Sequence, residues 1–145
     1  MLRKVLDMFR DDTPDNNNEI SVELATAALL SEIIRADRHA DERELQAYKT
    51  MLTEQFSLRD EELSTLMEEG QESAEDAVDM VQFTQVLNEK CDHDKKHAIL
   101  QSLWEVAYAD KEIAPIEEHT IRRIADLMHI PHSQFIKTKL AVTDD

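Results

Sequence analysis

The sequence predicts an all-α protein, a compact bundle of seven to eight helices. The 145 residues include one glycine and three prolines, whereas the turns and bulges of a many-stranded sheet usually need several glycines. Apolar residues recur at helical spacing along most of the chain, and residues typical of helix caps separate the periodic segments. The length fits one domain. We therefore expect one helical domain over 19–145, preceded over 1–18 by a short helix and a polar linker.

The first segments differ sharply in polarity. Met1–Phe9 is amphipathic and lacks the apolar run of a secretory signal, and residues 11–18 are polar without any periodicity. A helix over about Ile20–Ala36 is apolar nearly all round, which predicts burial on most sides. The next helix begins after Asp41, because Asp41 and Glu44 occupy the N-cap and N3 positions of a capping box.

The later helices are each marked by a cap residue. Gly70 is placed where a left-handed residue would end a helix, and proline is tolerated in a first helical turn. The expected segments are Ser57 to Gly70, Ser73 to about Lys90, Asp94 to Tyr108, a helix from Pro115 and a helix from Pro131. The segment from Asp94 is again apolar nearly all round, so it and the 20–36 helix are expected to form the centre. Phe83, Trp104, Tyr108 and the regularly spaced methionines are expected to be core residues.

The two apolar helices and their following turns read as an internal duplication. A constant shift aligns Leu30-Ser-Glu-Ile-Ile-Arg-Ala-Asp37 with Leu103-Trp-Glu-Val-Ala-Tyr-Ala-Asp110. The identical pairs are Leu30/Leu103, Glu32/Glu105, Ala36/Ala109, Asp37/Asp110 and Glu44/Glu117. Each unit is thus a buried helix ending in Ala-Asp, a short turn, and a second helix with Glu near its start. The fold is expected to contain this helix-turn-helix unit twice.

The acidic turns are the candidate site. Their carboxylates offer only hard oxygen ligands, which suit Ca²⁺, Mg²⁺ or Mn²⁺. An acid at a helix C-terminus is disfavoured by the helix dipole, so a cation there would be stabilising. The candidate metal ligands are Asp37, Asp41, Glu44, Asp110, Glu112 and Glu117. The competing interpretation is that these side chains cap helices, since Asp and N3 Glu both accept backbone N–H groups.

Other chemistries have weaker signals. Cys91, His93 and His97 could supply three zinc ligands, but the second ligand pair of a structural zinc site is missing. No nucleophile with a base and an orienting partner can be identified, so no catalytic residue is assigned. The sequence contains neither a P-loop nor a dinucleotide-binding fingerprint. No cofactor is required, and a divalent cation is the one candidate.

The second turn, Ala107-Tyr-Ala-Asp-Lys-Glu-Ile-Ala-Pro-Ile-Glu-Glu118, and more faintly Ala36-Asp37…Glu44, resemble the paired acidic turns of the TerB-like domains, named for tellurite resistance. The resemblance covers about Val22 to Leu140. It implies a cytoplasmic helical bundle whose acidic residues hold a metal ion. The chain departs from the family pattern where a Gly often follows the Asp, because Arg38 and Lys111 stand there instead.

Charge and composition limit the partners. The net charge of −16 repels nucleic acid and anionic lipid and favours cations and basic surfaces. No apolar run is long enough to span a membrane, and a single cysteine suits a reducing cytoplasm. The leading hypothesis is a non-enzymatic, cytoplasmic TerB-like domain that binds protein partners, in a stress or tellurite-resistance setting. The alternatives are a divalent-cation binder or sensor using the acidic turns, and a carboxylate-based hydrolase.

Overall fold

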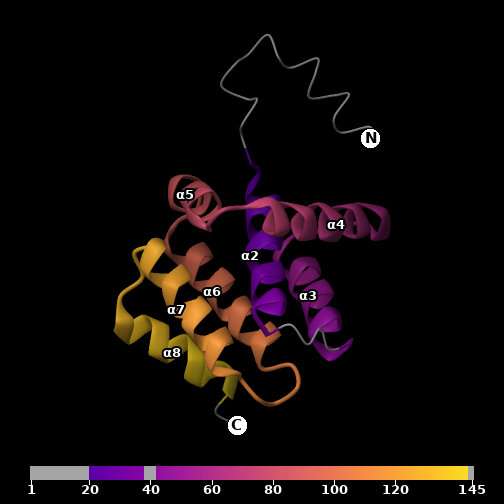
Figure 1. The fold of residues 1–145 in the computed structure, drawn as a ribbon. Coiled ribbons are helices and arrows are strands. Elements are labelled where there is room, and N and C mark those ends of the chain that lie inside the picture. The colour runs from indigo at the N-terminus through magenta and orange to yellow at the C-terminus, as the bar shows by residue number, and fades with distance from the viewer. Residues whose placement is uncertain (1–19, 38–41, 144–145) are drawn as a thin grey trace.

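The computed structural model describes residues 20–37 and 42–143, and in these residues it is entirely helical (Figure 1). Seven helices and no strand occur in the described ranges, as the sequence predicts. They are α2 (Val22–Asp37), α3 (Glu42–Gln55), α4 (Asp60–Asp76), α5 (Val81–Lys90), α6 (His93–Ala107), α7 (Pro115–Leu127) and α8 (His132–Thr143). The helix and linker expected over 1–18, together with Arg38 and Asp41, lie outside the described residues.

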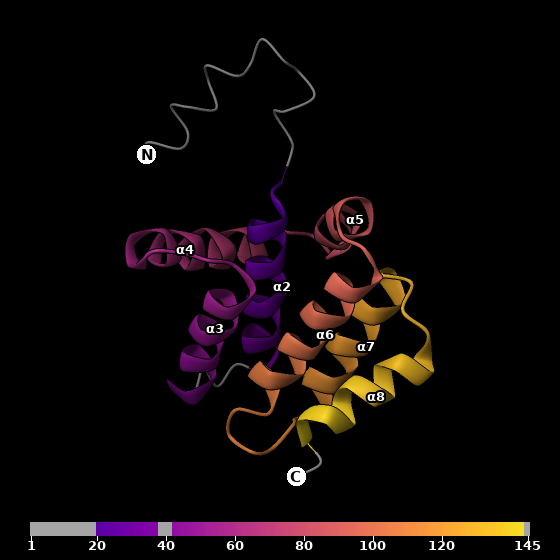
Figure 2. The same cartoon turned by 180° about the vertical axis from the view of Figure 1, so that it is seen from behind.

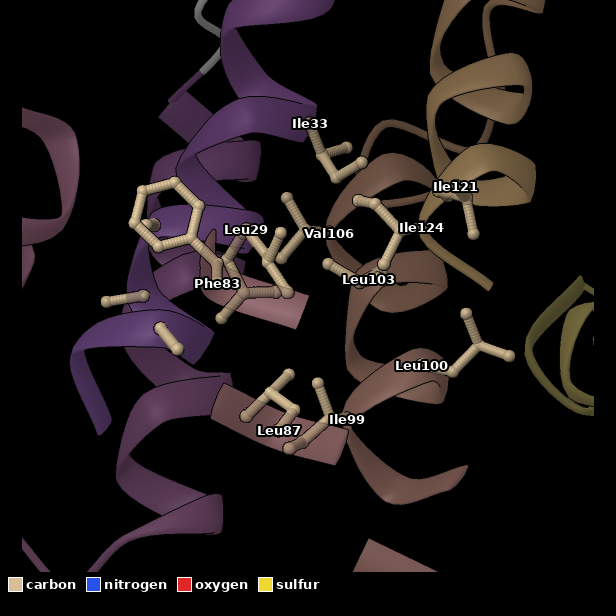
Figure 3. Close-up of a cluster of buried hydrophobic side chains, with 14 of the residues drawn as sticks. Leu29, Ile33, Phe83, Leu87, Ile99, Leu100, Leu103, Val106, Ile121 and Ile124 are labelled. Carbon is tan, nitrogen blue, oxygen red and sulfur yellow. The ribbon is translucent and has the colours of Figure 1, made fainter. Parts of the chain in front are cut away.

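Helices α2 and α6 form the centre of the bundle, which confirms the expectation from their apolar composition. Helix α2 contacts five other helices, α3 to α7, and α6 contacts α2, α3, α7 and α8. Figure 3 shows side chains of α2, α5, α6 and α7 meeting in one cluster, among them Leu29, Ile33, Phe83, Leu87, Leu103, Val106 and Ile124. Each of these is at most 1% exposed. Burying such a side chain stabilises the fold by about 1.5–3 kcal/mol.

The two predicted helix-turn-helix units pack against each other. Helix α2 packs against α7 of the other unit, and α6 packs against α3, in addition to the contacts that each unit makes within itself. In Figures 1 and 2 the C-terminal ends of α2 and α6 and the N-terminal ends of α3 and α7 lie at the same end of the bundle. We call this end the corner end. Both acidic turns are therefore attached to one end of the molecule.

Two predicted helix starts are corrected by the local hydrogen bonds. Helix α6 is capped by Asp92, whose Oδ1 accepts the Lys95 N–H at 2.8 Å, and the expected cap Asp94 lies inside the first turn. Ser57 does not begin α4. The N-cap of α4 is Arg59, whose backbone N–H donates to Glu62 Oε1 at 2.9 Å. The glutamate at N3 thus supplies the cap interaction. The predicted proline starts hold within one residue, since α7 begins at Pro115 and α8 follows Pro131.

The expected helix end at Gly70 is wrong, and with it the start at Ser73. Helix α4 continues through both residues to Asp76, and Gly70 does not have a positive φ. A Cβ atom on Gly70 would lie 2.6 Å from Ala27 Cβ and 2.7 Å from the Tyr48 Oη. A glycine is needed here because α4 crosses α2 at close range and there is no space for a side chain. The break falls instead before α5, at residues 77–80.

Candidate functional site

The second corner, between α6 and α7, is built around backbone hydrogen bonds to its acids. Asp110 Oδ1 accepts the Glu112 N–H at 3.1 Å, and Glu117 Oε1 accepts the Ala114 N–H at 2.9 Å. Glu117 is the third residue of α7 and is 1% exposed. It therefore makes half of a capping box, satisfying the N–H of the residue that precedes the helix. Glu112 is exposed at the surface of the turn.

Lys111 follows Asp110 in the left-handed region, with a φ of 70°. This is the position where glycine often stands in the family the sequence resembles, and a left-handed conformation is one that glycine adopts readily. A non-glycine residue pays roughly 1–2 kcal/mol for that conformation. The Lys111 ammonium lies 5.2 Å from the centre of the Tyr108 ring, which places a positive charge beside the turn.

The first corner repeats the burial of its glutamate. Glu44 is the third residue of α3 and is 1% exposed, as Glu117 is in α7. Asp37 is the last residue of α2, and Asp41 lies outside the described residues. The duplication thus places a buried glutamate at N3 of both second helices. The repeat is therefore structural at this glutamate. The expected helix end at Ala-Asp is wrong in the second unit, because α6 ends at Ala107 and Asp110 lies in the turn, whereas α2 continues to Asp37.

The capping interpretation explains what the second corner shows. Asp110 and Glu117 each accept a backbone N–H through one carboxylate oxygen. Within residues 20–37 and 42–143, no three His, Cys, Asp or Glu side chains are grouped so as to hold a metal ion. The cation hypothesis therefore stays a prediction, and Cys91, His93 and His97 form no such group either. Burial raises the pKa of the Cys91 thiol, which makes it a poorer nucleophile.

A groove that the sequence analysis did not anticipate runs between α3 and α6. Helix α3 lines it with one helical stripe, Arg43, Gln46, Ala47, Thr50, Met51 and Glu54. The facing stripe consists of Ala98, Gln101, Ser102 and Glu105 of α6, continued by Tyr108 and Ala109 of the turn that follows it. The helices are antiparallel here, since Gln55 near the end of α3 donates to the Ala98 carbonyl at the start of α6. We call this feature the α3–α6 groove.

The α3–α6 groove has two connected parts. The larger, of about 400 Å³, lies at the corner end, where Lys111 and Val142 of α8 also line it. The smaller, of about 190 Å³, extends toward Gln55. Met51 and Glu105 line both parts, so they mark the middle of the groove. The volume of the larger part is within the range typical of binding sites, and its lining mixes apolar and polar side chains, whereas the smaller part is mainly polar.

Glu105 is the chemically distinctive residue of the groove. It is half-buried, and desolvation raises the pKa of its carboxyl, with the nearby charge of Glu54 adding to the rise and Lys111 opposing it. Glu105 is also one of the residues repeated between the two units, so the sequence did contain a signal. The expected core positions Met51 and Tyr108 are corrected by the structure: both are half-buried and line the groove. A helical stripe does not reveal by itself whether another helix covers it.

The family model described as tellurite resistance protein TerB matches residues 23–140. The chain belongs to the TerB family. The match spans both helix-turn-helix units and the α3–α6 groove, and it confirms the family indicated by the acidic turns. Neither the curated proteins nor the solved structures give a match. Among the described helices of this TerB-family chain, none is both long and apolar enough to cross a membrane.

Proposed function

We propose that this TerB-family chain is a non-catalytic binding module that engages a protein partner through the α3–α6 groove. The observation that carries the proposal is the construction of the groove from two antiparallel helical stripes. Such surfaces receive an amphipathic helix, whose apolar residues at i, i+3, i+4 and i+7 enter the groove. The apolar surface of Ala47, Met51 and Tyr108 supports that mode, and polar side chains surround it.

The setting we propose is cytoplasmic, within a stress or tellurite-resistance response. The family name supports the second part. The cytoplasmic setting is supported by the single cysteine, Cys91, which is free. A chain with one cysteine cannot form an internal disulfide, and such chains are common in reducing compartments.

The test is a selection of helical peptides from a random displayed library against the purified chain. Ala47→Arg places a long side chain in the groove, and Thr53→Arg adds the same charge at an exposed position of α3 that does not line it. Enriched peptides should bind the wild type and the Thr53→Arg variant, and they should not bind the Ala47→Arg variant. Circular dichroism checks that both variants fold, and Thr50→Lys provides a second groove variant. Enriched peptides that bind Ala47→Arg and Thr50→Lys as tightly as the wild type would place the binding surface elsewhere and reject the proposal.

Divalent-cation binding at the corner end is a second candidate. It is supported by the matching burial of Glu44 and Glu117, two carboxylates with hard oxygen ligands at one end of the bundle. Titration with Ca²⁺, Mg²⁺ or Mn²⁺ should raise the melting temperature progressively with the logarithm of the ion concentration above Kd. At a hundredfold excess over Kd the free energy of unfolding should rise by about 2.7 kcal/mol. The double variant Asp110→Asn/Glu117→Gln should abolish the shift. A melting temperature unchanged by millimolar ion would end this candidate.

A further inference from the structure

The two repeats differ at one carboxylate, and the difference lies in the α3–α6 groove. Glu32 of α2 and Glu105 of α6 are equivalent in the duplication. Glu32 Oε1 lies 2.8 Å from Arg35 Nη1, and the same nitrogen donates to the Ala74 carbonyl of α4 at 3.3 Å. In the first repeat the acid thus has an arginine one turn further along its own helix, held in place by a neighbouring helix.

The second repeat does not have that arginine. The residue equivalent to Arg35 is Tyr108, which cannot neutralise a carboxylate. Within the described part of the chain, no ion pair or hydrogen bond engages the Glu105 carboxylate. A half-buried carboxylate in that position has given up part of its hydration, which is unfavourable while it is charged, and Lys111 offsets only part of that cost. Because no described residue forms an ion pair with it, Glu105 can accept a cation from a partner.

The surroundings of Glu105 identify the kind of cation. Glu54 lies on the facing stripe of α3 and adds a second negative charge to the same stretch of the groove. Ala47, Met51 and Tyr108 form an apolar surface next to Glu105, which suits the methylene stem of a lysine or arginine and the apolar face of the helix that bears it. A small inorganic ion would leave this apolar surface unused.

We propose that the α3–α6 groove takes a basic amphipathic helix of a partner protein, with a lysine or arginine of that helix forming an ion pair with Glu105. This inference rests on the proposed function and specifies the partner. The net charge of −16 favours a basic segment over an acidic one, and it opposes association of the chain with a second copy of itself. Helix α3 has 14 residues, so a bound helix of three to four turns would span the groove.

The probe is a pair of fluorescein-labelled helical peptides of about the length of α3. Both carry the same leucine stripe, and their polar positions hold lysine and glutamine in one peptide and glutamate and glutamine in the other. Fluorescence anisotropy at physiological salt measures their affinity for the full chain. The lysine peptide should bind at least tenfold more tightly than the glutamate peptide. Equal binding of the two would overturn the proposal.

Three substitutions separate the Glu105 ion pair from general attraction to an acidic protein. Glu105→Gln should lower the affinity for the lysine peptide about tenfold. This is the loss expected for a charge-assisted hydrogen bond in a partly desolvated site. Glu32→Gln removes the equivalent charge from the first repeat, and Glu61→Gln removes one from the exposed start of α4. Both should change the affinity less than twofold. Equal losses in all three variants would show that the attraction is diffuse, and would overturn the proposal.

The outcomes also separate this inference from the proposed function. Suppose that peptides selected with the wild type do not bind Ala47→Arg but bind Glu105→Gln with unchanged affinity. This result would support the groove as the binding site and would reject the ion pair between Glu105 and a basic partner. Sedimentation of the chain alone gives a further check. A dimer that Ala47→Arg dissociates and Thr53→Arg leaves intact would assign the groove to a second copy and reject the inference.

Discussion

Substituting Gly70 by alanine tests the close crossing of α2 and α4. On an open helix surface this change would stabilise the protein by about 1 kcal/mol, because alanine is the better helix former. At this position the new methyl group would lie 2.6 Å from Ala27 Cβ, 2.7 Å from Tyr48 Oη and 2.9 Å from the Ala27 carbonyl carbon. Real Cβ atoms do not approach other atoms so closely, and two of the three neighbours belong to the central helix, which cannot shift freely.

The strain should therefore exceed the gain in helix propensity. Overpacking of a well-packed core typically costs about 1–3 kcal/mol, and here it must first cancel about 1 kcal/mol of propensity. Because the contacts are unusually short, we expect Gly70→Ala to be destabilising by about 1–2 kcal/mol, which corresponds to a fall in melting temperature of about 3–7 °C for a domain of this size. Denaturant unfolding gives the free energy directly. Glu72→Ala, at an exposed position of the same helix, should change stability by less than about 0.5 kcal/mol.

A double-mutant cycle identifies the contact responsible. In the wild type, Tyr48→Phe loses the hydrogen bond from Tyr48 Oη to the Met67 carbonyl, 3.1 Å long, and should cost about 1 kcal/mol. In the Gly70→Ala background the same change also removes the crowded hydroxyl, so it should cost less or become favourable. A coupling energy of about 1 kcal/mol is expected between the two sites. A Gly70→Ala variant as stable as the wild type, with no coupling to Tyr48, would refute the argument that interhelix approach selects this glycine.

Three further predictions concern buried polar groups. Glu117→Ala should cost about 1–2 kcal/mol in denaturant unfolding, because the Ala114 N–H loses its acceptor. Thr138→Val should cost about 1–3 kcal/mol by the same assay, since it removes the acceptor 3.1 Å from the buried Trp104 Nε1. The pKa of Glu105 is raised in the folded state, so the folded protein binds more protons there and stability should fall as pH rises from the ordinary glutamate pKa through the raised one. Glu105→Gln should remove that part of the pH dependence, and an unchanged pH profile would contradict it.

Local patterns were sufficient wherever neighbouring residues carry the information. The apolar composition of α2 and α6 marked them as the buried centre, and Pro115 marked the start of α7. The glutamate repeated at N3 of α3 and α7 predicted two equivalent corners. These features depend on spacing along a single helix or across one short turn, so they can be read without knowing which helix packs against which.

The α3–α6 groove could not be found in that way. Its two stripes look like any other amphipathic faces, and Met51 and Tyr108 read as core residues until the structure shows that no described helix covers them completely. For Glu105 and Glu32 the sequence shows one difference, because Arg35 follows Glu32 by one turn and Tyr108 follows Glu105. That Glu105 faces a groove depends on the helix packed alongside, which the sequence does not show.

The use of glycine and of the left-handed backbone conformation shows most clearly what is local and what is tertiary. The sequence by itself determined an all-helical duplicated bundle, because helical periodicity and caps are local properties. A single glycine is also too few for the turns and bulges of a many-stranded sheet. Only the tertiary structure decided how that glycine is used. Gly70 lies in the middle of a helix where two backbones meet, while the described non-glycine residues with positive φ are Lys111 and His129. Close approach between distant segments has no local signature, so its demand on a residue appears only when the chain is packed.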